Sequence, residues 1–322
     1  MEATQAEYGK QTSRKPASRL LGALYATAVL VLGAGCGPTE ESSPSGLGTT
    51  AQEMVTLNGL AFNGLAFNGL AFNGLAFNGL AFNGLAFNGL SSEAFSAWFD
   101  TNPAMADMLM KYTVACAVPS GQVRTYTYKG TDYTWQGWLG LAPGWASGAA
   151  ATEAEQQVIS ACLAAHGNKY GKRVLISILG NDAQGQPIPT FSWEQDSFPE
   201  REACFFGNLF TGEGVYVGND RGRLNEREST ARACALSTSV EDAREACLPL
   251  VYVGSCQGSC TKDPTNTWYV SCKYNGITYR PLTTRMRSED IYRCGDGVCQ
   301  FTESCGTGRT YDSCRQDCGL CG

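Results

Sequence analysis

The stretch TEAEQQVISACLAAHGNKYGKRVLISILG, residues 152–180, indicates most clearly which kind of fold this chain adopts. Thr152 and, three residues later, Glu155 form a capping box, the pair of side chains that accepts the first free N–H groups of a helix. Apolar residues then recur at helical spacing through Cys162, and His166-Gly167 closes the helix. The run RVLISILG has the composition of a strand. The stretch therefore predicts an amphipathic helix followed by a strand.

The flanking sequence extends this pattern to a whole domain. Asn102-Pro103 predicts the cap and first turn of an earlier helix, which continues through AMADMLMKYTVACAV. Further strands are predicted in QVRTYTYKGTDYTWQGWLGLAPGW, GVYVG, LPLVYVG and TWYVSCKYNGITYRPL, the last with a hairpin turn at Asn275-Gly276. Because helices come early and strands dominate later, we expect an α+β fold: an antiparallel sheet with two or three helices, linked by disulfides.

The 15 cysteines indicate an oxidising compartment, where disulfides persist. If Cys36 is set aside, 14 remain, eight between Cys116 and Cys272 and six in the last 29 residues. Each group is even, which predicts two separately cross-linked modules. The predicted disulfide cysteines are Cys116, Cys162, Cys204, Cys234, Cys247, Cys256, Cys260, Cys272, Cys294, Cys299, Cys305, Cys314, Cys318 and Cys321.

The amino terminus predicts export. Four basic residues precede the uncharged run LLGALYATAVLVLGAG at 20–35, which at 16 residues is shorter than the about 20 apolar residues of a membrane-spanning helix and suits a signal peptide. The run ends as LGAGC on Cys36 and resembles the lipobox of bacterial lipoproteins, in which this cysteine carries lipid, including palmitate. With Gly37 next, the resemblance implies sorting to the outer membrane. The alternative is an ordinary secretory signal cleaved near Ala34.

A five-residue repeat fills residues 58–90, with Asn-Gly-Leu-Ala-Phe six times and a final Asn-Gly-Leu. Asn-Gly favours a type I′ turn, and the three residues between turns suit a short strand with Leu and Phe on one face. The repeat resembles a pentapeptide-repeat solenoid, but its 33 residues make fewer than two coils, too few for a stable stack. A disordered spacer, a strip paired with the following domain and a strip that self-associates remain open.

These features divide the chain into five parts. They are a signal peptide at 1–35, a lipid-anchored flexible tether at 36–56, the repeat at 57–90, a disulfide-linked α+β domain at 91–290, and a small cysteine-rich module at 291–322.

The terminal module contains too many cysteines in too few residues to hold a hydrophobic core, so disulfides must stabilise it. Its CGDGVC segment resembles small Cys-Gly-Asp-Gly-Val-Cys modules of secreted bacterial proteins and, more distantly, calcium-binding cysteine-rich repeats of extracellular receptors. Calcium takes oxygen ligands, whereas acids in such a module can also simply be solvated. The candidate calcium ligands are Asp296, Glu303, Asp312 and Asp317.

The segment FSWEQDSFPERE, residues 191–202, is predicted to be a loop between strands that crowds carboxylates and aromatic rings together. Glycoside hydrolysis needs two carboxylates at a suitable separation, and solvated loop acids are the alternative. The candidate catalytic residues are Glu194, Asp196 and Glu200.

Tryptophan suggests a second activity, because a flat aromatic ring stacks on a sugar. Trp135, Trp138 and Trp145, together with Trp193, are the candidate glycan-binding residues, and the alternative is that these rings fill the core. The only histidine, His166, ends a predicted helix without a Gly-x-Ser-x-Gly nucleophile in the chain, so we expect a structural role for it.

The segments GWLGLAPGWA, QQVISACLAAHGNKYGKRVLISILG and EACFFGNLF, with the repeat and the lipobox, resemble a family of uncharacterised secreted lipoproteins of Gram-negative soil bacteria. The resemblance implies location and fold and no activity. A net charge of −6 without a basic run argues against nucleic acid as a partner. We expect an exported, outer-membrane-anchored lipoprotein with a structural or binding role, and a secreted polysaccharide hydrolase is the alternative.

Overall fold

The computed structural model describes residues 65–66, 84–85, 87–168, 175–220 and 250–290, and in the terminal module 294, 295, 297, 299, 303, 305, 306 and 313–321. The signal peptide, the tether with Cys36, most of the repeat, and Cys234, Cys247, Asp296 and Asp312 lie outside these residues, so the predictions made for them stay predictions. Among the described helices, none has the length and apolar character needed to cross a membrane.

The two helices whose starts the sequence predicts begin at the expected residues. Asn102 caps α4 by accepting the N–H of Met105 at 3.2 Å, and Thr152 and Glu155 form the expected capping box of α6. The three longest described helices are α3 (Glu93–Thr101), α4 (Pro103–Ala117) and α6 (Glu153–His166). Short helical segments are α2 (Phe87–Leu90), α5 (Pro143–Ala146), α7 (Ser192–Ser197), α9 (Cys256–Ser259), η2 (Ser288–Asp290) and α10 (Arg315–Cys318).

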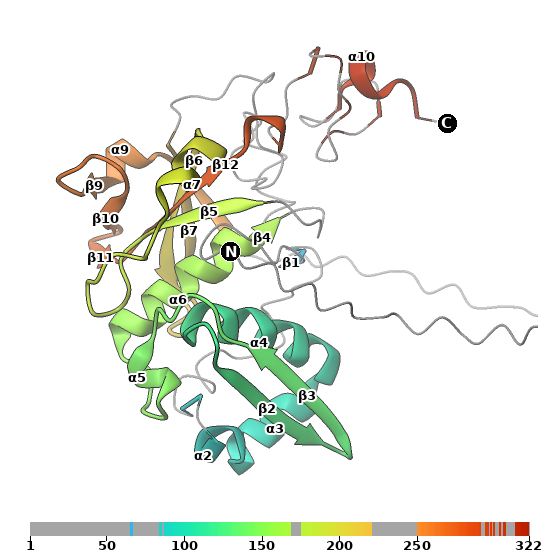
Figure 1. The fold of residues 1–322 in the computed structure, drawn as a ribbon, viewed down its shortest axis with the longest axis vertical. Helices are drawn as coiled ribbons and strands as arrows, with labels where there is room; N and C mark the ends of the chain where they lie inside the picture. Colours follow the sequence, from blue (N-terminus) through green and yellow to red (C-terminus); the bar gives the residue numbers. More distant parts are fainter. Residues whose placement is uncertain are drawn as a thin grey trace, which may run out of the picture. The chain divides into compact units, whose positions relative to one another are not determined.

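A five-stranded sheet forms the centre of the α+β domain, in the order β5-β12-β6-β7-β8. Its neighbours are antiparallel except for β7 and β8, which run parallel. In Figure 1, α6 lies between this sheet and α4. The strands are β5 (Ile176–Gly180), β6 (Glu200–Asn208), β7 (Gly214–Asn219), β8 (Leu250–Ser255) and β12 (Leu282–Met286).

Strand β6 separates two hydrophobic cores. Successive side chains of a strand point to opposite faces. Phe205 belongs to the large core that includes residues of α4 and α6, whereas Phe206 belongs to a smaller core with Tyr269 and Tyr279. The smaller core is completed by a three-stranded sheet of β9 (Cys260–Lys262), β10 (Tyr269–Tyr274) and β11 (Ile277–Tyr279), in the order β11-β10-β9.

Two hairpins are present, one of them at the turn that the sequence predicts. Asn275 and Gly276 connect β10 to β11 with positive φ angles of 50° and 83°, as a type I′ turn requires. The other hairpin pairs β2 (Val123–Tyr128) with β3 (Thr131–Gln136). The segment QVRTYTYKGTDYTWQGWLGLAPGW was predicted to contain strands, but its last residues form the helix α5.

The last units of the repeat are part of the large core. Leu85 and Leu90 are buried within it, and the Leu85 N–H donates to the Trp145 carbonyl at 2.9 Å. A Cβ at Gly84 would lie 2.2 Å from the backbone of Gly148, so only glycine fits there. Further upstream, β1 (Leu65–Ala66) pairs in parallel with β4 (Gly167–Asn168). At these described positions the repeat is docked on the domain.

Disulfides form within each of the two predicted groups of cysteines, and no described disulfide joins the groups. In the terminal module the first cysteine pairs with the fourth, the second with the fifth and the third with the sixth. In the α+β domain, Cys116–Cys162 joins α4 to α6. The six described disulfides are Cys116–Cys162, Cys204–Cys256, Cys260–Cys272, Cys294–Cys314, Cys299–Cys318 and Cys305–Cys321.

Candidate binding surface

The segment FSWEQDSF, predicted to be a loop, folds as the short helix α7, and this corrects the sequence interpretation. The helix begins at Ser192, and Glu194 caps this end, because its side chain accepts the N–H of Phe191 at 3.4 Å. At the other end the Phe198 N–H donates to the Glu194 carbonyl at 2.9 Å, and the Phe198 ring is buried. Pro199 follows, which lacks an N–H to continue the helix.

Glu194 anchors α7 to the central sheet. Its side chain is only 1% exposed, and its Oε1 accepts a hydrogen bond of 2.5 Å from the Ser177 hydroxyl on β5. Burial raises the pKa of this carboxyl, while the hydrogen bonds from Ser177 and the Phe191 backbone oppose that rise. Both carboxylate oxygens are therefore engaged inside the protein, and the group holds a helix in place.

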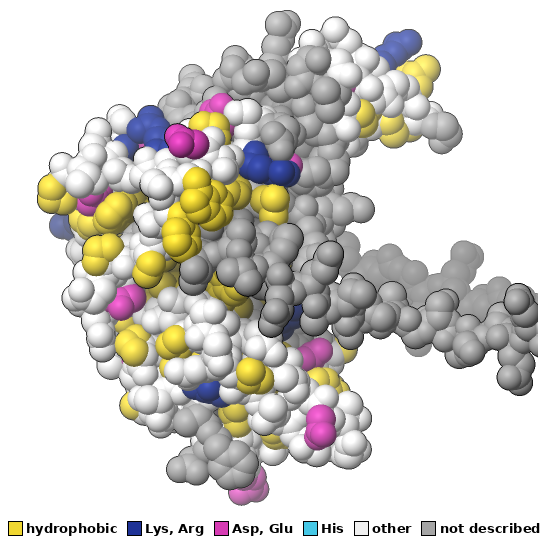
Figure 2. All heavy atoms as spheres, in the orientation of Figure 1, with side chains coloured by type: hydrophobic (Ala, Val, Ile, Leu, Met, Phe, Trp, Pro, Cys, Tyr) yellow, Lys and Arg dark blue, Asp and Glu magenta, His cyan; other side chains and the backbone are white. Residues whose placement is uncertain are grey.

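The anchored helix presents two aromatic rings to solvent. Phe191 and Trp193 are 36% and 42% exposed, and they are among the few large hydrophobic side chains that the described residues leave open. Their ring centroids are 5.8 Å apart and their planes differ by only 13°. Figure 2 shows hydrophobic side chains gathered where Figure 1 places α7 and β6. We call Phe191 and Trp193 the aromatic pair.

Trp135 and Trp145 do not form the expected exposed platform. Trp135 is 2% exposed and donates from its indole N–H to Asp107 Oδ1 at 2.7 Å. Trp145 is 0% exposed and meets the ring of Phe210 edge-on at a centroid distance of 5.6 Å. Both belong to the core, which was the alternative interpretation, and Trp138 is half-buried.

The other candidate catalytic acids do not share the environment of Glu194. Asp196 is exposed on α7. Glu200, at the start of β6, is half-buried and accepts a hydrogen bond of 3.0 Å from the Ser288 hydroxyl. Hydrolysis through Glu194 and a second carboxylate stays a prediction, and the burial of Glu194 does not favour it.

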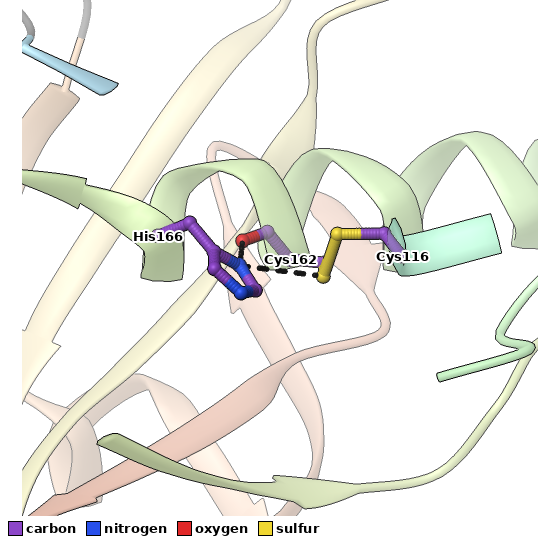
Figure 3. Close-up of side chains that lie close together, drawn as sticks. All are labelled: Cys116, Cys162 and His166. Carbon is purple, nitrogen blue, oxygen red and sulfur yellow. Dashed lines mark hydrogen bonds between the residues drawn. A yellow bond between two sulfur atoms is a disulfide. The ribbon is translucent and has the colours of Figure 1, made fainter. Parts of the chain in front are cut away.

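His166 occupies the structural position expected from the sequence (Figure 3). It is the last residue of α6 and is buried, and its Nδ1 lies 2.8 Å from the carbonyl oxygen of Cys162. Because that oxygen can only accept, Nδ1 carries the proton of this hydrogen bond. The same nitrogen is 3.6 Å from the Cys162 sulfur, which is bonded to Cys116.

Of the four candidate calcium ligands, the structure describes Glu303 and Asp317. The Asp317 carboxylate accepts the backbone N–H groups of Gly295 at 2.5 Å and Gly297 at 3.1 Å, so it holds these two glycines against α10. Glu303 is buried beside the Cys299–Cys318 disulfide. Calcium binding stays a prediction, since the other two acids lie outside the described residues.

Comparisons with protein-family models, with curated proteins and with solved structures find no match to this chain. The resemblance to secreted lipoproteins therefore stays a prediction. The sequence predicted only part of the aromatic pair: Trp193 was among the candidate glycan-binding residues, and Phe191 was not. Composition alone could not identify Phe191 as a binding residue. The exposure of its ring depends on α7, and the sequence predicted a loop in place of this helix.

Proposed function

We propose that this protein is an exported, lipid-anchored binding protein whose α7 surface recognises glycan. The observation that carries the proposal is the aromatic pair, two exposed and nearly parallel rings held on an anchored helix. The lipid anchor at Cys36 and outer-membrane sorting rest on the sequence alone. They would place this surface outside the cell, where polysaccharides are abundant ligands.

The chemistry of α7 favours a sugar over a purely apolar ligand. A pyranose ring has apolar C–H faces, which pack on flat aromatic rings, and a rim of hydroxyls, which needs hydrogen-bonding groups. The aromatic pair supplies the flat surface, and Ser192, Gln195 and Asp196 are exposed polar side chains on the same helix. A binding site with apolar surface and a few polar groups is the usual arrangement for small ligands.

Rigid support of the pair favours binding as well. The hydrogen bond from Ser177 to Glu194 and the burial of Phe198 fix α7 at both ends. Rings that are already ordered lose little conformational freedom when a ligand binds, so more of the contact energy appears as affinity.

A glycan array followed by titration calorimetry tests the proposal on the full exported chain. We expect Trp193→Ala to weaken binding of the best glycan at least tenfold, about 1.4 kcal/mol, because an aromatic anchor is lost. Tyr252→Ala removes another exposed aromatic side chain, on β8, and should leave the affinity unchanged. A wild-type protein that binds no glycan, or a Trp193→Ala variant with full affinity, would show the proposal to be wrong.

A further inference from the structure

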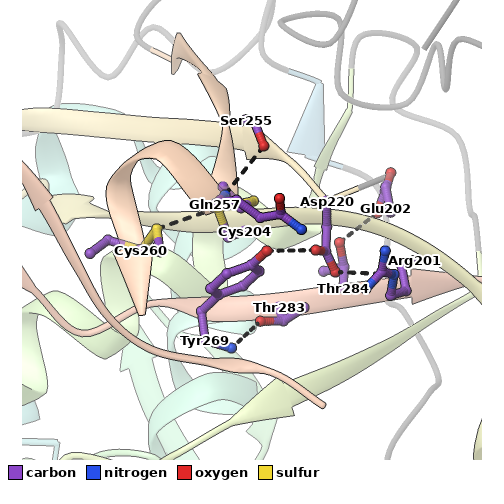
Figure 4. Close-up of a disulfide and its surroundings, with 12 residues drawn as sticks. Arg201, Glu202, Cys204, Asp220, Ser255, Gln257, Cys260, Tyr269, Thr283 and Thr284 are labelled. Atoms are coloured by element: carbon purple, nitrogen blue, oxygen red, sulfur yellow. Dashed lines mark hydrogen bonds and ion pairs between the residues drawn. A yellow bond between two sulfur atoms is a disulfide. The ribbon is translucent and has the colours of Figure 1, made fainter. Parts of the chain in front are cut away.

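Three cationic side chains lie near one buried carboxylate in a different part of the domain. Figure 4 shows this carboxylate, Asp220, with Tyr269 and Arg201. Asp220, which directly follows β7, has a fully buried side chain and accepts a hydrogen bond of 2.7 Å from the Tyr269 hydroxyl. Lys262 Nζ lies 3.8 Å from Asp220 Oδ1, and Arg201 Nε lies 3.9 Å from Oδ2. Arg285 is the third cation, directly opposite Arg201 in the pairing of β12 with β6. We call Arg201, Lys262 and Arg285 the cation cluster.

The charges of the cation cluster are not balanced by Asp220. Two arginines directly opposite each other on neighbouring strands repel. Burial lowers the pKa of the Arg285 guanidinium, the charge of Arg201 lowers it further, and Asp220 only partly opposes this. Glu202 lies at a register shift in the pairing of β6 with β12, and its carboxylate accepts the Thr284 hydroxyl at 2.6 Å. Among the described residues, the ion pairs of Arg201 and Lys262 both go to the one Asp220 carboxylate.

Hydrogen bonds in the cluster are also incomplete. Ion pairs of 3.8 and 3.9 Å are too long to be hydrogen bonds. Within the described part of the chain, Asp220 Oδ2 and Arg285 Nε are buried without a hydrogen-bond partner. Buried polar groups nearly always have one. Arg285 Nε is a donor and indicates a missing acceptor, whereas Asp220 Oδ2 is an acceptor and needs a donor. A water molecule could complete the hydrogen bonds and would leave the excess of positive charge unchanged.

Part of the cluster is accessible to solvent. The Arg201 side chain is 39% exposed and that of Lys262 is 13% exposed, while Asp220 lies beneath them. Guanidinium groups bind oxyanions through paired N–H donors, and an ammonium group adds a third donor. Asp220 and its hydrogen bond from Tyr269 hold the positive groups together from below.

We propose that Arg201, Lys262 and Arg285 form a binding site for an oxyanion group, a phosphate, sulfate or carboxylate. The bound group accepts from both guanidinium groups and from the lysine ammonium, and it brings the negative charge that Asp220 alone does not supply. The same chemistry fits a free anion and an anionic substituent on a glycan.

Thermal melting of the full chain at constant ionic strength tests this site, with chloride replaced stepwise by inorganic phosphate or sulfate. A ligand that binds only the folded state raises its stability by RT ln(1 + [L]/Kd), so we expect a saturable rise in melting temperature. Arg285→Gln should abolish the saturable rise, and Arg285→Lys, which keeps the charge without the paired donors, should weaken apparent binding about tenfold. Arg287→Gln is the matched control, since the Arg287 guanidinium already pairs with Asp290 at 2.7 Å, and it should retain the full rise.

Arg201→Gln serves as a second variant in case Arg285→Gln does not fold, and it should also lose the rise. The absence of a saturable rise in wild type, or an unchanged rise in both Arg201→Gln and Arg285→Gln, would overturn the proposal.

Sulfated and neutral forms of one oligosaccharide distinguish the sources of the oxyanion. Tighter binding of the sulfated form than of free sulfate indicates a glycan substituent, and equal binding indicates a free anion. Trp193→Ala should leave the phosphate effect intact, which separates this site from the aromatic pair.

Discussion

Two groups of aromatic side chains in this protein come from similar sequence and have opposite environments. In the β2–β3 hairpin, Tyr126, Tyr133 and Trp135 pack around Phe99 of α3, with centroid distances of 4.9, 5.0 and 6.3 Å. On α7, Phe191 and Trp193 stack on each other and face solvent. Both segments mix aromatic and polar residues.

The difference lies in what each backbone packs against. The hairpin places its rings on one face, because alternate residues of a strand share a face, and α3 covers that face. In α7 the residues that turn inward are Glu194 and Phe198, so the rings at Phe191 and Trp193 are left outside. Aromatic residues therefore stabilise the fold in the first region and are available for a ligand in the second.

The largest effect that would sharpen this comparison is expected at Trp135. Trp135→Ala removes a buried ring of the hairpin from the large core and should lower the free energy of unfolding by about 3–5 kcal/mol. Trp193→Ala, at an exposed ring, should stay within about 0.5 kcal/mol of wild type. Urea denaturation of both variants measures the difference, and equal losses would contradict the assignment of the two rings.

A somewhat smaller effect is expected at the end of the repeat. Leu85→Ala should cost about 2–5 kcal/mol, because Leu85 is buried in the same core and bonded through its backbone to Trp145. Leu320→Ala is the matched control at a position that is 61% exposed. Denaturant unfolding tests both, and a Leu85→Ala variant as stable as wild type would mean that the repeat is not part of the core.

The smallest expected effect is on how the stability of the protein depends on pH, through Glu194, which supports the aromatic pair. Burial raises the folded-state pKa of Glu194, so the folded protein retains a proton that the unfolded chain releases above the ordinary value of about 4.3. The stability of wild type should therefore fall as pH rises from that value through the raised pKa. Glu194→Gln has no such proton to lose and keeps hydrogen-bonding groups for Ser177 and Phe191. As the pH rises through this range, the free energy of unfolding of the variant should therefore increase relative to that of wild type.

Asp196→Asn is the control for the pH experiment, because it removes an exposed charge from the same helix. Denaturation at a series of pH values gives the two differences from wild type. If Glu194→Gln and Asp196→Asn showed the same dependence on pH, the buried carboxyl would not be its source.

Local sequence signals predicted much of the fold. The helix starts at Asn102 and Thr152 and the hairpin at Asn275-Gly276 were predictable because each depends on hydrogen bonds or φ angles within a few residues. The α7 helix was missed because it is only six residues long, and its stability comes from Ser177 on another strand. Local propensity is a weak guide for such a short element.

The candidate sites were predicted less well than the fold. Acidic and aromatic residue types singled out Glu194 and Trp193 as candidates, but they could not tell that the carboxylate is buried and the ring exposed. The cation cluster gave no signal at all, because Arg201, Lys262 and Arg285 come from three strands that are far apart in the sequence.

The sequence by itself determined the α+β class, the caps and turns, and the two closed groups of cysteines, since these follow from short-range geometry and from the parity of each group. Only the tertiary structure decided which cysteines pair, which aromatic rings are buried and which charges meet. Those outcomes depend on contacts between segments that are distant along the chain, and the energy of such contacts is fixed only when the strands and helices have packed together.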